Sequence, residues 1–164
     1  MPTAPEPLST SDPISDFDSG VPSLDEWLRH RAVQNKISGA SRTFVTCSDG
    51  KVVGYYALAS SAVIPAAAPG RFRRNMPDPI PVVVLARLAV DQTEQGKGLG
   101  HALFEDASKR VIYAAETIGI RGLLVHALSE DGKAFYVTLG LEVSALDPMT
   151  LMVTITDLQS ALNN

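Results

Sequence analysis

Residues 87–101 read RLAVDQTEQGKGLGH, and this stretch decides the fold. It continues an apolar run over residues 82–90, which is typical of a strand buried on both faces. It leads into apolar residues at helical spacing: Leu99, Leu103, Ala107, Val111, Ala115 and Ile118, with Gly119 ending the helix. A buried strand, a polar glycine-rich loop and a long helix predict an α/β domain whose loop presents backbone N–H groups to an anion.

The flanking sequence predicts a mixed central sheet flanked by helices. Ser23 and Glu26 match a capping box, so we expect a helix over residues 24–37 that begins at Ser23. Ser129 is expected to cap a second helix, which Gly140 stops. The remaining predicted elements are a hairpin of strands 43–47 and 51–58, a long loop over 61–81, strands 120–128 and 151–155, and a short helix over 157–162.

The chain has 164 residues, which predicts a single domain over residues 1–164. Residues 1–20 contain too few apolar residues in any period to form a core element, and we expect residues 1–14 to be an extended or flexible arm. The single cysteine, Cys47, excludes a disulfide framework and a cysteine-rich zinc site, so no metal is expected. No apolar run approaches the roughly 20 residues of a membrane span and no secretory signal is visible, which together predict a cytoplasmic protein.

Charge is unevenly distributed along the chain. The formal net charge is −4, yet residues 27–78 carry eight basic and two acidic residues. A local basic segment can bind a polyanion even in an acidic protein, because affinity follows local phosphate contacts. The alternative is a solvated helix face together with a mobile basic loop.

Three kinds of nucleotide loop compete for residues 95–100. A Walker A loop needs Gly-Lys-Ser/Thr, whereas Gly98 follows Lys97 here. A dinucleotide-binding turn needs its glycines directly after the strand and an acid at the end of the next strand, and neither is present. The third is the coenzyme A loop: Gln95-Gly96-Lys97-Gly98-Leu99-Gly100 resembles the Q/R-x-x-G-x-G/A motif with which GNAT-superfamily acetyltransferases bind acetyl-coenzyme A.

The resemblance extends over roughly residues 15–155 and narrows to the GNAT toxins of toxin–antitoxin modules, the TacT and AtaT group. The stretches that carry it are FDSG (17–20), LDEWL (24–28), GYYAL (54–58), RRNMP (73–77), LLVHAL (123–128) and AFY (134–136). Those toxins acetylate the α-amino group of aminoacyl-tRNA and so stop translation. The resemblance therefore implies a GNAT fold, acetyl-coenzyme A as co-substrate, aminoacyl-tRNA as substrate, a ribbon-helix-helix antitoxin as partner, and a homodimer.

The same resemblance assigns roles to individual residues. Tyr136 is the expected general acid for the departing thiolate, because a phenol with an ordinary pKa near 10 is protonated at neutral pH. The expected coenzyme-binding residues are Leu88, Ala89, Val90, Gln95, Gly96, Lys97, Gly98, Leu99, Gly100 and His101. The expected tRNA contacts are Arg29, Lys36, Arg71, Arg73 and Arg74, since arginine forks suit phosphate.

No side chain stands out as a general base. His126 lies between apolar residues on a strand, which favours a satisfied core histidine, and His30 is expected at the surface of a helix. Two further functions stay open. One is a GNAT enzyme that acts on a small amine or a protein N-terminus; the other is a non-catalytic domain that keeps coenzyme A as a structural ligand.

Overall fold

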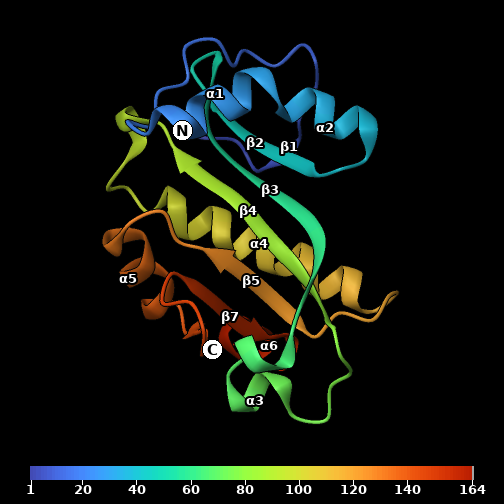
Figure 1. Cartoon of the computed structure of the whole chain (residues 1–164). Coiled ribbons are helices and arrows are strands. Elements are labelled where there is room, and N and C mark those ends of the chain that lie inside the picture. Colours follow the sequence, from blue (N-terminus) through green and yellow to red (C-terminus); the bar gives the residue numbers. More distant parts are fainter. Residues whose placement is uncertain (164) are drawn as a thin grey trace. The chain divides into compact units, whose positions relative to one another are not determined.

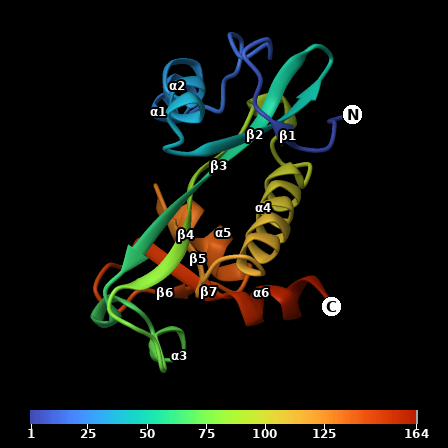
Figure 2. The same cartoon turned by 90° about the vertical axis from the view of Figure 1, so that its right-hand side faces the viewer.

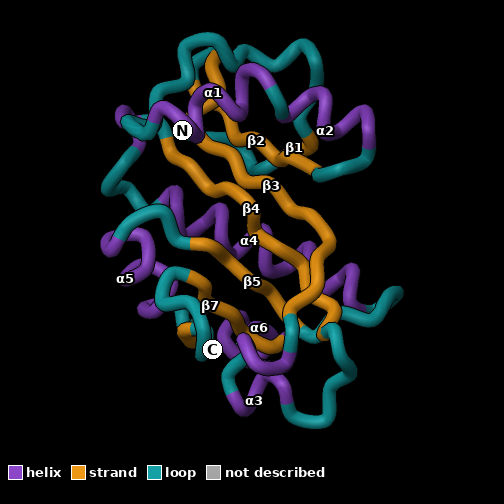
Figure 3. Tube along the Cα trace, viewed as in Figure 1, coloured by secondary structure: helices purple, strands orange, loops and turns teal. Residues whose placement is uncertain are grey.

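The described residues, 1–163 of a computed structural model, form a mixed seven-stranded sheet in the order β1-β2-β3-β4-β5-β7-β6 (Figures 1 and 3). The strands are β1 (Glu6–Pro7), β2 (Arg42–Ser48), β3 (Lys51–Val63), β4 (Ile80–Val90), β5 (Gly122–His126), β6 (Glu142–Val143) and β7 (Thr150–Thr154). The helices are α1 (Pro22–His30), α2 (Ala32–Ser38), α3 (Gly70–Arg73), α4 (Leu99–Ala115), α5 (Glu130–Thr138) and α6 (Ile155–Leu162), with short 3-10 turns η1 (Pro65–Ala67) and η2 (Gln92–Glu94).

Contacts divide the chain into two compact units, and each is described by itself. Unit 1 comprises residues 1–59 and 86–107. Unit 2 comprises residues 60–85 and the chain from Ser108 onward. The strands β3 and β4 and the helix α4 contribute residues to both units.

Unit 1 is built on the predicted hairpin, which is confirmed. β2 and β3 pair antiparallel with Val45 opposite Tyr55, and positive φ angles at Asp49 and Gly50 make the tight turn between them. Successive β3 residues face opposite sides of the sheet. Tyr55 packs against α1, where its hydroxyl donates to the Leu24 carbonyl (2.7 Å), whereas a Cβ on Gly54 would lie 3.1 Å from Leu103 of α4. Helices therefore cover both faces of the hairpin, as Figure 2 shows.

The helix predicted over residues 24–37 is two helices, and its capping box is wrong. The chain leaves helical geometry at Arg31, which ends α1 and begins α2. The N-cap of α1 is Val21, so Ser23 lies inside the helix. The carboxylate of buried Asp25 instead accepts the N–H and hydroxyl of Ser19 (3.0 and 2.6 Å), which ties the helix to the segment before it.

The N-terminal residues contribute to the core, contrary to the expectation from their composition. Leu8 is 0% and Phe17 1% exposed, and both pack in a cluster with Leu28 and Tyr55. β1 extends the sheet beside β2, and the Thr3 N–H donates to the Cys47 carbonyl. Two well-spaced apolar residues on an extended segment leave no periodic pattern, so the sequence does not predict their burial.

Unit 2 has β5 at its centre. β5 runs parallel to β4, with Val82–Leu85 opposite Gly122–Val125, and antiparallel to β7. The caps of its helices follow the expected chemistry: the Ser129 hydroxyl accepts the Gly132 N–H (3.1 Å), as predicted, and Thr154 does the same for α6.

The loop expected over residues 61–81 is more ordered than its proline content indicates. It contains the end of β3, η1 and α3, and Phe72 of α3 is buried. This packing depends on Gly122, where a Cβ would lie 2.0 Å from the Val153 carbonyl oxygen and 2.7 Å from the Phe72 ring. α4 buries Leu103, Ala107 and Val111 as predicted but ends at Ala115, which leaves the predicted core residue Ile118 exposed.

Candidate active site

The loop between β4 and α4 has the backbone geometry of an anion-binding turn. Gly96 and Gly98 have φ angles of +78° and +85°, which residues with a Cβ rarely adopt. Both are exposed, and a Cβ at either position would meet no described heavy atom within 4 Å. Glycine is therefore required here for conformation, and the space beside the backbone is open to a ligand.

The start of α4 supplies the donors. Its first helical hydrogen bond runs from the Ala102 N–H to the Gly98 carbonyl (3.1 Å). The N–H groups of the preceding residues have no partner within the helix, and the helix dipole adds about half a positive charge at this end. Lys97 and His101 are exposed beside these donors, with the Lys97 ammonium 3.1 Å from the Glu94 carboxylate. Such a turn binds phosphate.

Gln95 fixes the loop to the rest of unit 1. Its side-chain amide donates to the Ser19 carbonyl (2.8 Å) and to the Val90 carbonyl (2.9 Å). The first of these bonds joins residues 76 positions apart. Gln95, one of the expected coenzyme-binding residues, therefore uses its side chain to hold the loop in place.

Asp91, the first residue after β4, is a buried anchor that sequence analysis did not single out. Its carboxylate accepts the N–H groups of Asp18 and Thr93 (both 3.0 Å) and lies 3.3 Å from the Lys51 ammonium. Burial acts to raise the pKa of Asp91, but the Thr93 and Asp18 N–H groups, the Thr93 hydroxyl and Lys51 outweigh it and hold the pKa below its ordinary value. The carboxylate is therefore ionised when the loop is in place.

The expected thioester-binding residues, Leu88, Ala89 and Val90, form the last three positions of β4. Pairing with β3 continues to this end, because the Asp91 N–H donates to the Val53 carbonyl (2.8 Å). The strand is therefore held up to the residue at which the loop begins.

A cavity of about 340 Å³ lies beside the loop in unit 1. One wall is the N-terminal segment Met1–Pro5, and the other is formed by Glu94 and by residues 97–99, 102 and 103. The N-terminal segment therefore lies next to the first turn of α4.

Tyr136 lies in α5 of unit 2 and is 8% exposed. Its ring meets the Phe135 ring edge to face, with centroids 5.2 Å apart. Burial raises the pKa of Tyr136 to about 12, which corrects the ordinary value assumed from sequence. The phenol is therefore neutral over the physiological range, as a proton donor must be.

His126 is exposed, so the expectation of a core histidine is wrong. It is the last residue of β5, and its Nδ1 lies 2.9 Å from the Thr150 hydroxyl. The apolar neighbours in sequence are buried strand residues, whereas the chain turns to solvent at His126. His30 is exposed on α1, as expected.

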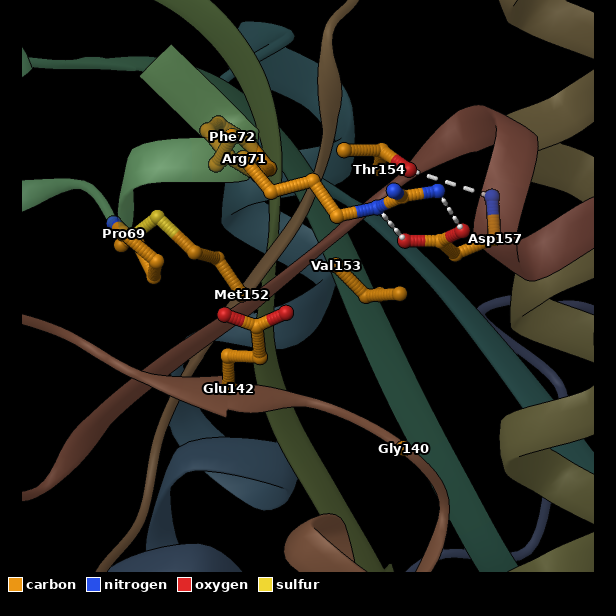
Figure 4. A pocket seen from close by; sticks show the side chains of 9 residues that line it. All are labelled: Pro69, Arg71, Phe72, Gly140, Glu142, Met152, Val153, Thr154 and Asp157. Atoms are coloured by element: carbon orange, nitrogen blue, oxygen red, sulfur yellow. Dashed lines mark hydrogen bonds and ion pairs between the residues drawn. The ribbon is translucent and has the colours of Figure 1, made fainter. Parts of the chain in front are cut away.

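Arg71, one of the expected tRNA contacts, is paired within unit 2. Its guanidinium donates two hydrogen bonds to the Asp157 carboxylate of α6 (2.8 and 2.7 Å), seen side by side in Figure 4. The Arg121 side chain donates to the carbonyls of Arg71 and Phe72 (2.8 and 2.7 Å). The two arginines together fasten α3 to its neighbours in unit 2.

The other expected tRNA contacts fall into two groups. In unit 1, Arg29 donates to the Phe17 carbonyl (2.9 Å) and Lys36 to the Leu8 carbonyl, so both cations hold the N-terminal segment. In unit 2, Arg73 and Arg74 are exposed and have no hydrogen bond or ion pair through their side chains to any described residue. Of the five expected tRNA contacts, only Arg73 and Arg74 have no hydrogen bond or ion pair of their side chains within residues 1–163.

The structure therefore gathers the expected coenzyme residues, with Arg29 and Lys36, in unit 1, and Tyr136 with the three arginines of the α3 region in unit 2. Among residues 1–163 no group of three or more His, Cys, Asp or Glu side chains could hold a metal ion. Within the same range, every helix is too short or too polar to cross a membrane.

Comparison with known proteins identifies the family of the chain. Residues 39–142 match the family model of the acetyltransferase (GNAT) domain. The chain is 52% identical to the tRNA-acetylating toxin of Mycobacterium tuberculosis over 162 residues, which cover 99% of this chain and 98% of that protein.

Two solved structures of the toxin AtaT are similar along the whole chain. AtaT complexed with acetyl-methionyl-tRNAfMet has a TM-score of 0.90 at 29% identity, with 99% of each chain covered. A tyrosine-to-phenylalanine mutant of AtaT, bound to the C-terminus of the antitoxin AtaR and to acetyl-CoA, has a TM-score of 0.85 at 27% identity, covering 100% of this chain and 99% of that one. The chain therefore belongs to the GNAT acetyltransferases and is a relative of the tRNA-acetylating and AtaT toxins.

Proposed function

We propose that this protein transfers the acetyl group of acetyl-CoA to the α-amino group of aminoacyl-tRNA and thereby blocks translation. The observation that carries the proposal is 52% identity to a tRNA-acetylating toxin over nearly the full length of both chains. The similarity to AtaT in its complex with acetyl-methionyl-tRNA supports the same acceptor.

Acetyl-CoA is the donor that a GNAT domain uses, and the loop of unit 1 fits its pyrophosphate. The backbone of residues 95–101 would hold the phosphates, because the two glycines turn their N–H groups outward at the start of α4. The backbone N–H groups of Leu88, Ala89 and Val90 would polarise the thioester oxygen. Asp91 and Gln95 keep both segments in place.

Tyr136 would act as the general acid. A neutral phenol can donate its proton to the thiolate as the carbon–sulfur bond breaks, and burial keeps Tyr136 neutral. An α-amino group needs less help from a base than a lysine would, because its ordinary pKa is about 7.7–8.0 against about 10.4.

Arg73 and Arg74 are the best supported tRNA contacts, since both are exposed arginines without an internal partner among residues 1–163. Arg29, Lys36 and Arg71 are weaker candidates for tRNA contact, because each already serves a carbonyl or carboxylate of its own unit. The alternative acceptors, a small amine or a protein N-terminus, have no phosphate backbone for basic residues to bind. The basic residues therefore favour tRNA as the acceptor.

The proposal extends to partners and organisation. The matched AtaT structure with AtaR supports an antitoxin, for which we propose the ribbon-helix-helix type. We further propose that residues 1–164 work as one GNAT domain, that the protein is a homodimer, and that it acts in the cytoplasm, where charged tRNA is used.

Cell-free translation tests the proposal. Addition of the protein should stop peptide synthesis only when acetyl-CoA is present, and fresh aminoacyl-tRNA added after removal of acetyl-CoA should restore it. Inhibition without acetyl-CoA, or no inhibition with it, would refute the proposed function.

A further inference from the structure

The carboxyl end of β5 carries a hydrogen-bonded chain of three polar side chains on the surface of unit 2. His126, the last β5 residue, lies opposite Thr150 of β7 in the antiparallel register. Its Nδ1 is 2.9 Å from the Thr150 hydroxyl oxygen. That hydroxyl in turn donates to an Asp147 carboxylate oxygen at 2.8 Å.

These two hydrogen bonds determine which imidazole nitrogen of His126 carries the proton. A hydroxyl has one proton, and Thr150 uses it toward Asp147, because an ionised carboxylate can only accept. Toward His126 the Thr150 oxygen must therefore accept, so Nδ1 carries the hydrogen. The neutral ring then has its lone pair on Nε2, which has no hydrogen-bond partner among residues 1–163.

Asp147 is held as a carboxylate. The Met149 N–H donates to its other oxygen (2.9 Å), and this bond and the Thr150 hydroxyl outweigh desolvation and hold the pKa of Asp147 below its ordinary value. The Asp147 carboxylate therefore accepts the Thr150 hydroxyl proton, which leaves the Thr150 oxygen to accept a hydrogen bond from Nδ1.

His126 lies at the carboxyl end of β5, directly after Val125, the last residue that pairs with the parallel strand β4. In open α/β sheets, ligands bind outside the carboxyl ends of the parallel strands. α5 begins four residues later, at Glu130, and it carries Tyr136 in its second turn, so both side chains belong to the same strand–helix unit.

We propose that His126 is the general base that deprotonates the acceptor amine. The inference rests on the proposed function, which leaves the base unassigned. His126 Nε2 takes a proton from the α-ammonium, and the freed amine lone pair forms a bond to the acetyl carbon. The carbon–sulfur bond then breaks, and the thiolate takes the Tyr136 proton. The second amine proton is lost as the amide forms, a proton returns to the Tyr136 oxygen through solvent, and the imidazolium releases its proton to solvent.

Acetylation of charged tRNA by His126→Ala at neutral pH, with and without added imidazole, tests this role. Loss of a general base should lower the rate by about 10² to 10⁴, and imidazole should restore part of it. Affinity for acetyl-CoA should stay unchanged, and His30→Ala, which removes another exposed histidine, should keep full activity. An unchanged rate in His126→Ala, or a loss that imidazole does not restore at all, would overturn the assignment.

A second measurement tests the hydrogen bonds among His126, Thr150 and Asp147. Nitrogen NMR of the imidazole should show the Nδ1–H form in the wild type and a mixture of the two neutral forms in Thr150→Val, which removes the acceptor. Thr150→Val should also acetylate more slowly without losing acetyl-CoA affinity. An Nε2–H form in the wild type would contradict the proposal. These outcomes are separate from the proposed function, whose failure would appear as inactivity of the wild type toward charged tRNA.

Discussion

Asp157→Asn distinguishes two roles for Arg71, a tRNA contact or a fastening of α3. The substitution keeps the shape of the side chain and removes the charge that receives two hydrogen bonds from the guanidinium. If Arg71 contacts phosphate, losing this competitor should strengthen tRNA binding. If Arg71 fastens α3, tRNA binding should stay the same or weaken, because Arg73 and Arg74 lose their support. We expect the second result.

The magnitude follows from exposure. The side chains of Arg71 and Asp157 are 59% and 35% exposed, so solvent screens the pair and its contribution to stability should be small. For a chain of this length, losing a screened surface pair should lower Tm by at most about 4 °C. Arg71 holds the pKa of Asp157 below its ordinary value, so this stability is present above the ordinary carboxyl pKa and is lost as the pH falls through the lowered one.

The assay is a titration of charged tRNA at several salt concentrations, with Arg73→Ala/Arg74→Ala as the comparison. Removing phosphate contacts should flatten the log–log salt slope by something under one unit for each contact. Asp157→Asn should leave that slope unchanged, whereas the double variant should flatten it and keep acetyl-CoA affinity. A steeper slope and tighter binding in Asp157→Asn would refute the fastening role, and an unchanged slope in the double variant would remove Arg73 and Arg74 from the tRNA surface.

Three further substitutions test the site and the fold. Gly98→Asp places a Cβ at a φ of +85° and a negative charge where phosphate should lie, so acetyl-CoA affinity measured by calorimetry should collapse in a folded protein; retained affinity would contradict the loop assignment. Tyr136→Phe removes one hydroxyl with little change in packing and should slow acetyl transfer by about 10² to 10⁴, with a rate equal to wild type excluding Tyr136 as the acid. Gly122→Ala should destabilise the protein by about 3 kcal/mol or more in denaturant unfolding, because its Cβ would lie 2.0 Å from a backbone oxygen. Gly119→Ala is the control, since a Cβ there meets open space and should change stability little. Equal effects of the two substitutions would contradict the close packing at β5.

Much of the fold could be predicted because its signals are local. The run over residues 82–90 and the four-residue spacing after Leu99 are periodic patterns, and both elements form as expected. Ser129 works as an N-cap because its hydroxyl meets a backbone N–H three residues away. Each of these depends only on neighbouring residues.

The errors have a common cause, which is contact between distant residues. Ser23 matches a capping box, yet Asp25 reaches Ser19 and the helix begins earlier. Residues 61–81 looked too rich in proline for a helix, but burial of Phe72 against Gly122 stabilises one turn. No pattern in the sequence shows these partners.

In the candidate site, too, local features are visible in the sequence and contacts between distant residues are not. The glycines of the coenzyme loop are visible in the sequence, because their spacing reports backbone geometry. The hydrogen bonds of His126 to Thr150 and of Arg71 to Asp157 join residues 24 and 86 positions apart, so an apolar neighbourhood made His126 look buried and a cluster of cations made Arg71 look available. The strand predicted over residues 120–128 has His126 inside it, whereas β5 ends at His126, and this shorter strand is what exposes the side chain.

Acetylation of charged tRNA is tested most directly by incubating the protein with labelled acetyl-CoA and charged total tRNA, then cleaving the ester and identifying the released amino acids by mass spectrometry. We expect N-acetylated amino acids from charged tRNA and no label on uncharged tRNA, free amino acids or protein N-termini. Label that appears on small amines or protein N-termini, with charged tRNA left unmodified, would contradict this expectation.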